Sequence, residues 1–142
     1  MGAYLDSSAA VKLFLVDEGV ALDLAAMFEA FGSVATSQLT YVETRSALAA
    51  GRRSGRLSVD AHDSAVRDLE LAWRTLFVVD LSGRVVREAG DAAETFGLRA
   101  GDAVQLASLR SLQDAGATLV AWDARLRAAA TASGFACYPP EI

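Results

Sequence analysis

The sequence predicts an α/β fold of three layers, α/β/α, around a central parallel sheet of four to five strands. Short runs rich in Val and Leu alternate with longer stretches of helical period, which is the pattern of βα units on a parallel sheet. Several helical stretches end in glycine or in a turn of Gly, Arg and Ser residues. A chain of 142 residues without repeats or linkers predicts that residues 1–142 form a single domain.

The expected strands are short and apolar, and lie near residues 3–6, 33–36, 76–80, 117–121 and 135–138. The stretch "DSSAAVKLF" predicts a helix directly after the first strand. The next helix ends at Gly32 and carries one apolar stripe, made of Val20, Leu24, Met27, Phe28 and Phe31.

Four more helical stretches complete the pattern. One begins after Ser37, a suitable cap, and is followed by "SVDAHDSAVRDLELAWRTL", which leads into the strand "FVVDL". A pair of helices is expected over 83–96 and 100–115, and a last helix follows the strand "TLVAW".

Composition limits the classes of function. The 18 acidic and 13 basic side chains give a net charge of -5, which argues against a broad basic surface for nucleic acid but not against a metal-dependent nuclease. The apolar content of 53% suggests a surface covered by another chain, so we expect an oligomer or an obligate partner.

We expect a soluble protein of a reducing, cytoplasmic compartment. Cys137 is the only cysteine, so no disulfide framework can form within the chain. The apolar runs are far shorter than the roughly 20 residues that a membrane span needs.

Four acidic residues stand where solvated acids are uncommon. Asp6 and Asp123 end two strands, and the carboxyl ends of parallel strands face the ligand crevice of such sheets. Glu43 lies at helical spacing from Leu39 and Ala47, on or beside an expected apolar face that also includes Val42 and Ala50. Asp102 opens a helix and shares its face with Leu106 and Leu109.

Each acid also has a structural interpretation. Asp6 and Asp123 are suitable N-caps, Asp102 suits the positive end of a helix dipole, and Glu43 can reach solvent through its flexible stem. If the four converge, their repulsion calls for a cation, and an all-oxygen donor set favours Mg²⁺ or Mn²⁺ over zinc. Such ions suit phosphoryl chemistry.

The segments "LDSSAAVKLF", "TYVETRSAL", "LRAGDAVQLA" and "AWDARLRAAATASGF" resemble the PIN domain, most closely the VapC-like ribonuclease toxins of type II toxin–antitoxin pairs. The likeness spans essentially the whole chain. It implies a three-layer fold, dependence on Mg²⁺ or Mn²⁺, and endonucleolytic cleavage of single-stranded or looped RNA by water. It also implies a cognate antitoxin protein and a homodimer.

The resemblance assigns the catalytic, metal-binding acids to Asp6, Glu43, Asp102 and Asp123, and a supporting hydroxyl to Ser7. The chain departs from the family's pattern at Ala121, where many relatives have Thr or Ser, so Asp123 is the least supported as a direct ligand.

Partner contacts are expected on two surfaces. The candidate RNA contacts are Arg45, Arg52, Arg53 and Arg99, with Arg56 beside them. Val11, Leu13, Phe14 and Leu15 of the first helix, with the helix that ends at Phe31, are expected to form a groove for an antitoxin segment.

Other classes fit less well. A phosphoaspartate receiver with Asp80 as acceptor would lack its lysine, because Lys12 is the only lysine and lies in another helix. A haloacid-dehalogenase-type phosphatase needs an acid where Ser8 stands. A catalytically weak PIN-like interaction module and a housekeeping PIN nuclease without an antitoxin remain as alternatives.

Overall fold

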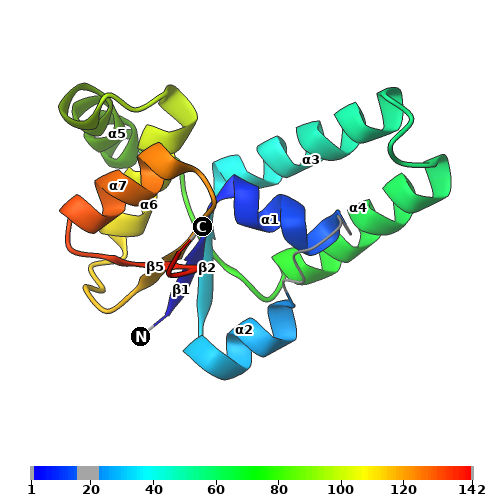
Figure 1. Ribbon diagram of the computed structural model, residues 1–142, viewed down its shortest axis with the longest axis horizontal. Helices are drawn as coiled ribbons and strands as arrows, with labels where there is room; N and C mark the ends of the chain where they lie inside the picture. Colours follow the sequence, from blue (N-terminus) through cyan, green and yellow to red (C-terminus); the bar gives the residue numbers. More distant parts are fainter. Residues whose placement is uncertain (1, 16–22, 142) are drawn as a thin grey trace.

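A computed structural model describes residues 2–15 and 23–141 of the chain (Figure 1). Twelve helices and strands follow one another in these segments, in the order β1 (Ala3–Leu5), α1 (Ser7–Phe14), α2 (Leu24–Phe31), β2 (Val34–Ser37), α3 (Gln38–Arg53), α4 (Val59–Trp73), β3 (Phe77–Val79), α5 (Gly83–Phe96), α6 (Ala100–Ser111), β4 (Thr118–Val120), α7 (Ala124–Ala132) and β5 (Ala136–Tyr138).

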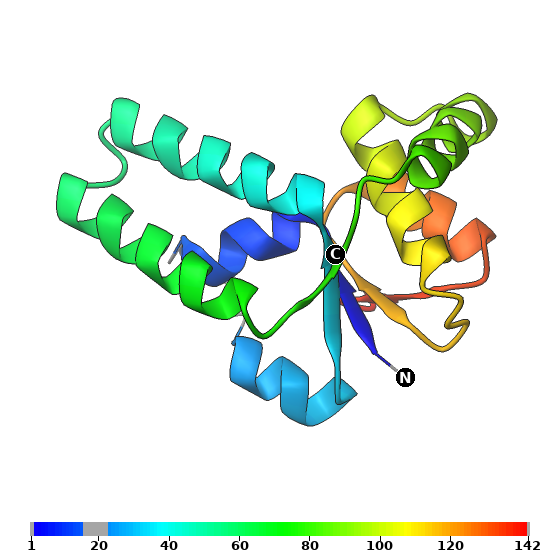
Figure 2. The same cartoon turned by 180° about the vertical axis from the view of Figure 1, so that it is seen from behind.

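The five strands form one parallel sheet in the order β3-β2-β1-β4-β5. The chain therefore moves outward from β1 to β3, returns across the sheet to β4, and ends at the other edge. With right-handed crossovers, this order puts α1–α4 on one face and α5–α7 on the other. Figures 1 and 2 show these two helical layers on opposite sides of the strands, so the expected three-layer α/β/α fold is confirmed.

The alternation of side chains along β1 builds a core on each face of the sheet. Ala3 and Leu5 pack with Met27 and the α1–α2 layer. Tyr4 points to the opposite face and packs with Leu106 and the α5–α7 layer. Because both faces are covered, the central strands are buried along their whole length, as in other parallel sheets.

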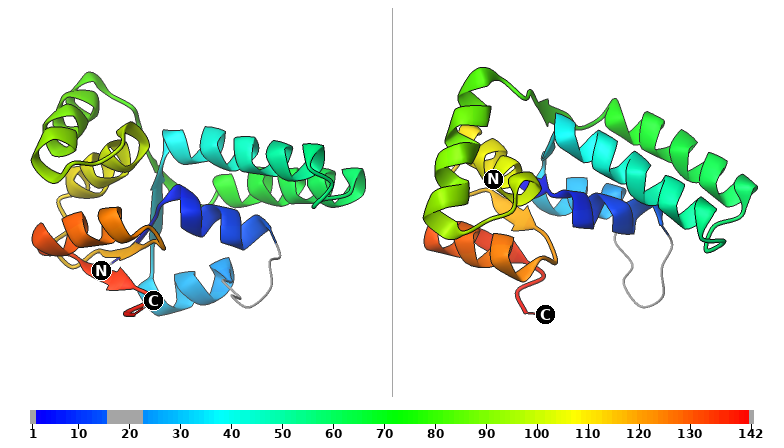
Figure 3. Two further views of the ribbon diagram at one scale, coloured as in Figure 1. Left: turned by 45° about the horizontal axis from the view of Figure 1, so that its top comes forward. Right: turned by 90° about the horizontal axis from the view of Figure 1, so that it is seen from above.

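Helices α3 and α4 form an antiparallel hairpin that projects beyond the sheet, as both views in Figure 3 show. Ser37 and Ser58 cap the two helices by accepting hydrogen bonds from Leu39 N and Ala61 N. Leu48 and Ala65 form the buried centre between these helices, together with Leu15 at the end of α1. The hairpin is thereby fixed to α1, whose first residues lie at the carboxyl end of β1.

All five strands lie within one residue of their expected positions, and the helix over 83–96 has the expected bounds. Helix α6 ends at Ser111, earlier than the expected residue 115. Its last turn tightens, since Leu112 N and Gln113 N donate to carbonyls three residues back, and Gln113 then takes a left-handed φ of 54°. Val20 of the expected α2 stripe lies outside the described residues.

The first-helix groove expected for a partner does not form as predicted. Leu13 and Phe31 pack against the core between the sheet and the α1–α2 layer. Phe14 packs against the α3–α4 hairpin. Val11 and Leu15 instead line a groove against α3. None of the helices in the described segments combines the length and apolar character needed to cross a bilayer.

Candidate active site

The acidic residues lie where the order of the sheet reverses. Strands β1 and β4 are neighbours, but the connections that follow them run to opposite sides of the sheet. Asp6 follows β1 directly, and Asp123 lies three residues beyond the end of β4. Ligand sites of open parallel sheets occur at such switch points, so the two predicted strand-end acids do share one edge.

Asp6 is the N-cap of α1 and is 3% exposed. Its Oδ1 accepts hydrogen bonds from Ser8 Oγ at 2.7 Å and from Ala9 N at 2.9 Å. Burial, with a smaller contribution from the charges of Asp102 and Asp123, raises the pKa of this carboxyl to about 6 despite these bonds. The cap interpretation is therefore correct, and the same side chain also lies in a field of negative charge.

Asp102 and Asp123 belong to the starts of α6 and α7. Asp102 is in the first turn of α6, and its pKa is raised by partial burial and by the nearby charge of Asp123. Asp123 is the N-cap of α7, where its Oδ1 accepts from Leu126 N at 2.9 Å. Arg99 lies beside both acids, 3.7 Å from Asp102 Oδ2 and 3.5 Å from Asp123 Oδ2.

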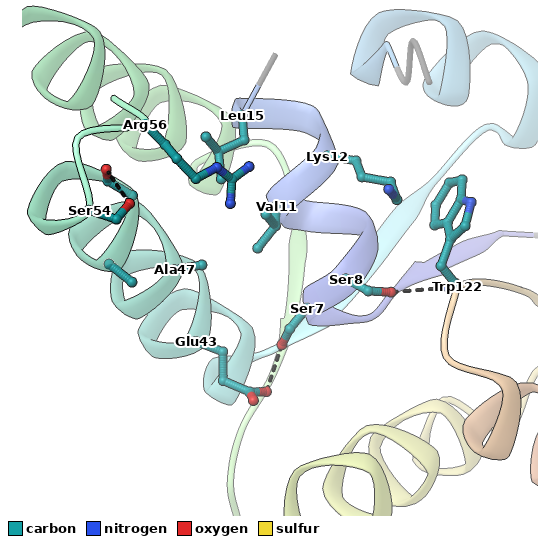
Figure 4. A pocket seen from close by; sticks show the side chains of 12 residues that line it. Ser7, Ser8, Val11, Lys12, Leu15, Glu43, Ala47, Ser54, Arg56 and Trp122 are labelled. Atoms are coloured by element: carbon teal, nitrogen blue, oxygen red, sulfur yellow. Dashed lines mark hydrogen bonds between the residues drawn. The ribbon is translucent and has the colours of Figure 1, made fainter. Parts of the chain in front are cut away.

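Glu43 reaches the same edge from α3. Its Oε1 accepts a 2.6 Å hydrogen bond from Ser7 Oγ (Figure 4). A Cβ atom at position 101 would lie 3.3 Å from Oε2, so the absence of a side chain at Gly101 lets the carboxylate approach α6. The charge of Glu43 also raises the pKa of Asp102.

The prediction of an apolar face around Glu43 is wrong. Val42 is 63% exposed, and Ala50 is exposed as well. The buried residues of this helix are Thr40, Thr44, Leu48 and Gly51. Threonine methyl groups and a glycine make up most of the face, so a count of apolar residues missed it. Glu43 lies beside this face, half-buried.

The four acids share an electrostatic environment that suits a hard cation. Their donors are all carboxylate oxygens, and the pKa values of Asp6 and Asp102 are raised, mainly by burial and also by the charges of neighbouring acids. Within residues 2–15 and 23–141, no three carboxylate, histidine or cysteine side chains lie in positions that would hold one ion as they stand. The chemistry of the donor set fits Mg²⁺ or Mn²⁺.

Several residues of this site escaped the sequence interpretation. Ser8, noted in the sequence only because it stands where a phosphatase would need an acid, donates to Asp6 and accepts from Trp122 N at 3.1 Å. Gln105, from α6, is 2% exposed and bonds to Tyr4 and Ser7. The signal in the sequence was a glutamine inside the apolar run "AVQLASL", which is costly to bury without partners.

The four candidate arginines are in different settings. Arg45 donates to Tyr41 Oη at 2.8 Å and lies 3.8 Å from Glu70. Arg52 and Arg53 are exposed in the last turn of α3. At a rise of 1.5 Å per residue they lie about 14 Å along the helix from Glu43. Arg99 alone among the four contacts two of the predicted site acids.

A groove of about 810 Å³ extends from the acidic residues along α1 and α3, and we call it the α1–α3 groove (Figure 4). Ser7 and Glu43 line one end of it. Val11, Leu15 and the small residues of α3 line its length, together with Arg56 near the far end of α3. The lining is mostly apolar, and Lys12 lies over the ring of Trp122 at 5.0 Å on the other side of α1.

Comparison with known families identifies the class of protein. A family model described as the PIN domain matches residues 3–132, so the chain belongs to the PIN-domain family. Ribonuclease VapC45 of Mycobacterium tuberculosis (strain CDC 1551 / Oshkosh) is 36% identical to it over 139 residues, which cover 98% of this chain and 96% of the relative. Ribonuclease VapC49 of strain ATCC 25618 / H37Rv matches with the same figures. These matches confirm the resemblance to VapC-like proteins.

Solved structures share the fold. PAE2754 from Pyrobaculum aerophilum aligns with a TM-score of 0.72 at 22% identity, over 96% of this chain and 90% of that one. FitAcB from Neisseria gonorrhoeae gives 0.66 at 17% identity, over 97% of both chains. VapBC2 from Rickettsia felis, bound to a DNA fragment from its promoter, gives 0.66 at 14%, over 96% and 97%.

The raised pKa of Asp6 predicts that the metal-free protein loses stability as pH rises. The usual pKa near 3.8 applies to the unfolded chain, and the folded value is about 6. Between these values the folded state holds a proton that the unfolded state has released, so the free energy of unfolding falls with rising pH, by on the order of 2 to 3 kcal/mol. Asp6→Asn keeps a capping oxygen and should remove this loss.

Urea unfolding of both proteins in EDTA, from pH 4 to pH 8, measures the effect as the difference between their pH slopes. Asp23→Asn, which changes an exposed cap of α2, controls for the loss of a capping carboxylate. Equal pH slopes for Asp6→Asn and wild type would contradict the raised pKa assigned to Asp6. Mg²⁺ should restore stability to wild type at pH 8 more than to Asp6→Asn.

Proposed function

We propose that this chain is an endoribonuclease that hydrolyses single-stranded or looped RNA, and that it acts as the toxin of a toxin–antitoxin pair. The observation that supports the proposal is that Asp6, Glu43, Asp102 and Asp123 lie near enough to the switch point of the sheet for their charges to interact. The chain that carries them is 36% identical to Ribonuclease VapC45. We also propose that residues 1–142 form a single domain, which contains this site. The structures of VapBC2 and FitAcB support the fold that the activity needs.

The activity is proposed to need Mg²⁺ or Mn²⁺, held by Asp6, Glu43, Asp102 and Asp123. When bound, such a cation supplies positive charge that lowers the pKa of water and stabilises the oxygen that leaves phosphorus. In each of Asp6, Glu43 and Asp123, one carboxylate oxygen accepts a hydrogen bond from the protein. This bond orients the second oxygen of the same carboxylate. Ala121 is fully buried and has no hydroxyl, so the hydrogen bond that Asp123 accepts from Leu126 N is what orients that acid.

Protein groups around the acids orient the carboxylates for the reaction. Ser8 and Ala9 N fix Asp6, and Ser7 fixes Glu43. Arg99 is proposed to contact an RNA phosphate, since it is 74% exposed and lies beside Asp102 and Asp123. Because water attacks the phosphodiester in this proposal, the products carry 5′-phosphate and 3′-hydroxyl ends.

Asp6→Asn should lower the cleavage rate at least about 1,000-fold, equivalent to about 4 kcal/mol of transition-state stabilisation. The reason is that the variant loses a charged donor in the acidic site. Cleavage of a single-stranded RNA in Mn²⁺ measures the rate, and mapping of the RNA ends checks the chemistry. Asp68→Asn, an exposed change on α4, is the matched control. Full activity of Asp6→Asn, or of wild type in excess EDTA, would refute the proposal.

We further propose that a cognate antitoxin places an apolar helical segment in the α1–α3 groove. The solved structures that share the fold include a toxin–antitoxin complex from Klebsiella pneumoniae and VapBC2 from Rickettsia felis. The groove is open, mostly apolar, and ends at Ser7 and Glu43. Its lining by Val11 and Leu15 retains part of the partner surface expected from the first helix.

A homodimer is the proposed state of the free protein. Phe77 is 64% exposed on the edge strand β3, and Leu71 on α4 is 62% exposed. Val42 on α3 is also exposed. Large apolar side chains in these positions are consistent with a surface that another copy covers.

Ala50→Trp should weaken antitoxin binding at least tenfold, because an indole at this exposed position would fill the α1–α3 groove. The RNA cleavage rate of the isolated variant should stay within about twofold of wild type. Binding to the protein encoded next to this chain, measured by calorimetry, provides the affinity. Ser46→Trp, at an exposed position of α3 outside the groove, is the control. Equal antitoxin affinities for the two variants would rule out this groove.

A further inference from the structure

A buried amide connects the elements that carry the acids. Gln105 lies on α6 three residues after Asp102 and is 2% exposed. Its Oε1 accepts a 2.6 Å hydrogen bond from Tyr4 Oη of β1. Its Nε2 donates at 3.0 Å to Ser7 Oγ of α1 and at 3.0 Å to Thr40 Oγ1 of α3. One side chain therefore joins α6 to β1, α1 and α3.

The chemistry of the amide sets the direction of every hydrogen bond in this network. Nε2 can only donate, so the Ser7 oxygen must accept, and the Ser7 proton is free for Glu43 Oε1 at 2.6 Å (Figure 4). With the amide turned the other way, Ser7 would donate to Gln105. Two acceptors, Ser7 Oγ and Glu43 Oε1, would then meet without a proton between them. Only the observed orientation satisfies all the partners.

The same network determines which oxygen of Glu43 is committed to the protein. Oε1 accepts from Ser7 and lies 3.5 Å from Gln105 Nε2. Oε2 lies on the side of Gly101, the residue before Asp102. Loss of the amide would free the Ser7 proton to turn away, and Glu43 would lose the bond that fixes its carboxylate.

We propose that Gln105 is a positioning residue of the acidic site, which acts through Ser7 to hold Glu43 in the orientation used for binding a divalent cation. This inference rests on the proposed function, because it concerns cation binding by the acids. A purely structural role for Gln105 would affect stability only. A positioning role also affects the affinity of the folded protein for the metal, and groups that orient metal ligands typically contribute 10- to 100-fold to that affinity.

The test is a Mn²⁺ titration of the full chain without RNA, with free Mn²⁺ measured by electron paramagnetic resonance. Gln105→Met and Ser7→Ala should each raise the Kd for Mn²⁺ at least about tenfold. The double variant should bind no more weakly than the weaker single variant, because both changes break one connection. Urea unfolding of each protein separately reports stability.

Leu69→Val is the matched control, since Leu69 is fully buried on α4, a helix that carries none of the four acids. It should lower the urea midpoint and leave the Kd for Mn²⁺ unchanged. If Gln105→Met does not fold, Gln105→Asn replaces it, because its amide is one methylene too short to reach Ser7; the same increase in Kd is expected.

A folded Gln105 variant that binds Mn²⁺ as wild type does would overturn the inference and leave the proposed function standing. Losses that multiply in the double variant would also overturn it, since the two residues would then act independently. A wild-type chain that binds no Mn²⁺ would overturn the proposed metal dependence, and this inference with it.

Discussion

The burial of carboxylates close to one another at one end of a parallel sheet is the constraint on which the structure of this site depends. Three of the four acids lie at helix N-termini, where the partial positive charge of each dipole favours an anion by about 0.3 to 1 kcal/mol. Asp6 and Asp123 cap α1 and α7, and Asp102 lies in the first turn of α6. The dipoles offset only part of the cost, because the pKa of Asp6 is still raised to about 6.

The same side chains thus serve the fold and the site. Oδ1 of Asp6 accepts a hydrogen bond from Ala9 N at the start of α1, as any capping aspartate would. The cap also fixes the direction of the carboxylate, so no separate group is needed to aim it. A structural role for such an acid is therefore compatible with the proposed functional one, since the capping bond also orients the carboxylate.

The sequence was sufficient to predict the strands of the sheet, because the residue patterns that mark strands and helices are local. Strand ends and helix starts also located Asp6, Asp102 and Asp123, which need only a correct topology to meet. Glu43 is different: its side of α3 depends on which face packs against α1 and α4. That face contains Thr40, Thr44 and Gly51, and a Cβ at Gly51 would lie 3.0 Å from Leu57. Close packing of small and polar residues leaves no periodic apolar signal.

Gln105 was missed for a related physical reason. A buried amide is stable only when its donors and acceptors are all paired, and its partners here come from residues 4, 7 and 40, far away in the chain. No local pattern encodes such a set. The prediction of a partner groove was wrong in part for the same reason, because whether Phe31 faces solvent or the core depends on how α2 packs against the sheet.

Helix α1 connects the proposed active site with the proposed partner surface through its geometry alone. Its first turn carries Ser7, which holds Glu43, and its next turns present Val11 and Leu15 to the α1–α3 groove. A segment that fills this groove lies against Ser7 and Glu43 at one end. In the proposed function, RNA could not then approach that side of the acids. Inhibition by a groove-bound partner would therefore need no change in the fold, only occupation of a surface that ends at the site.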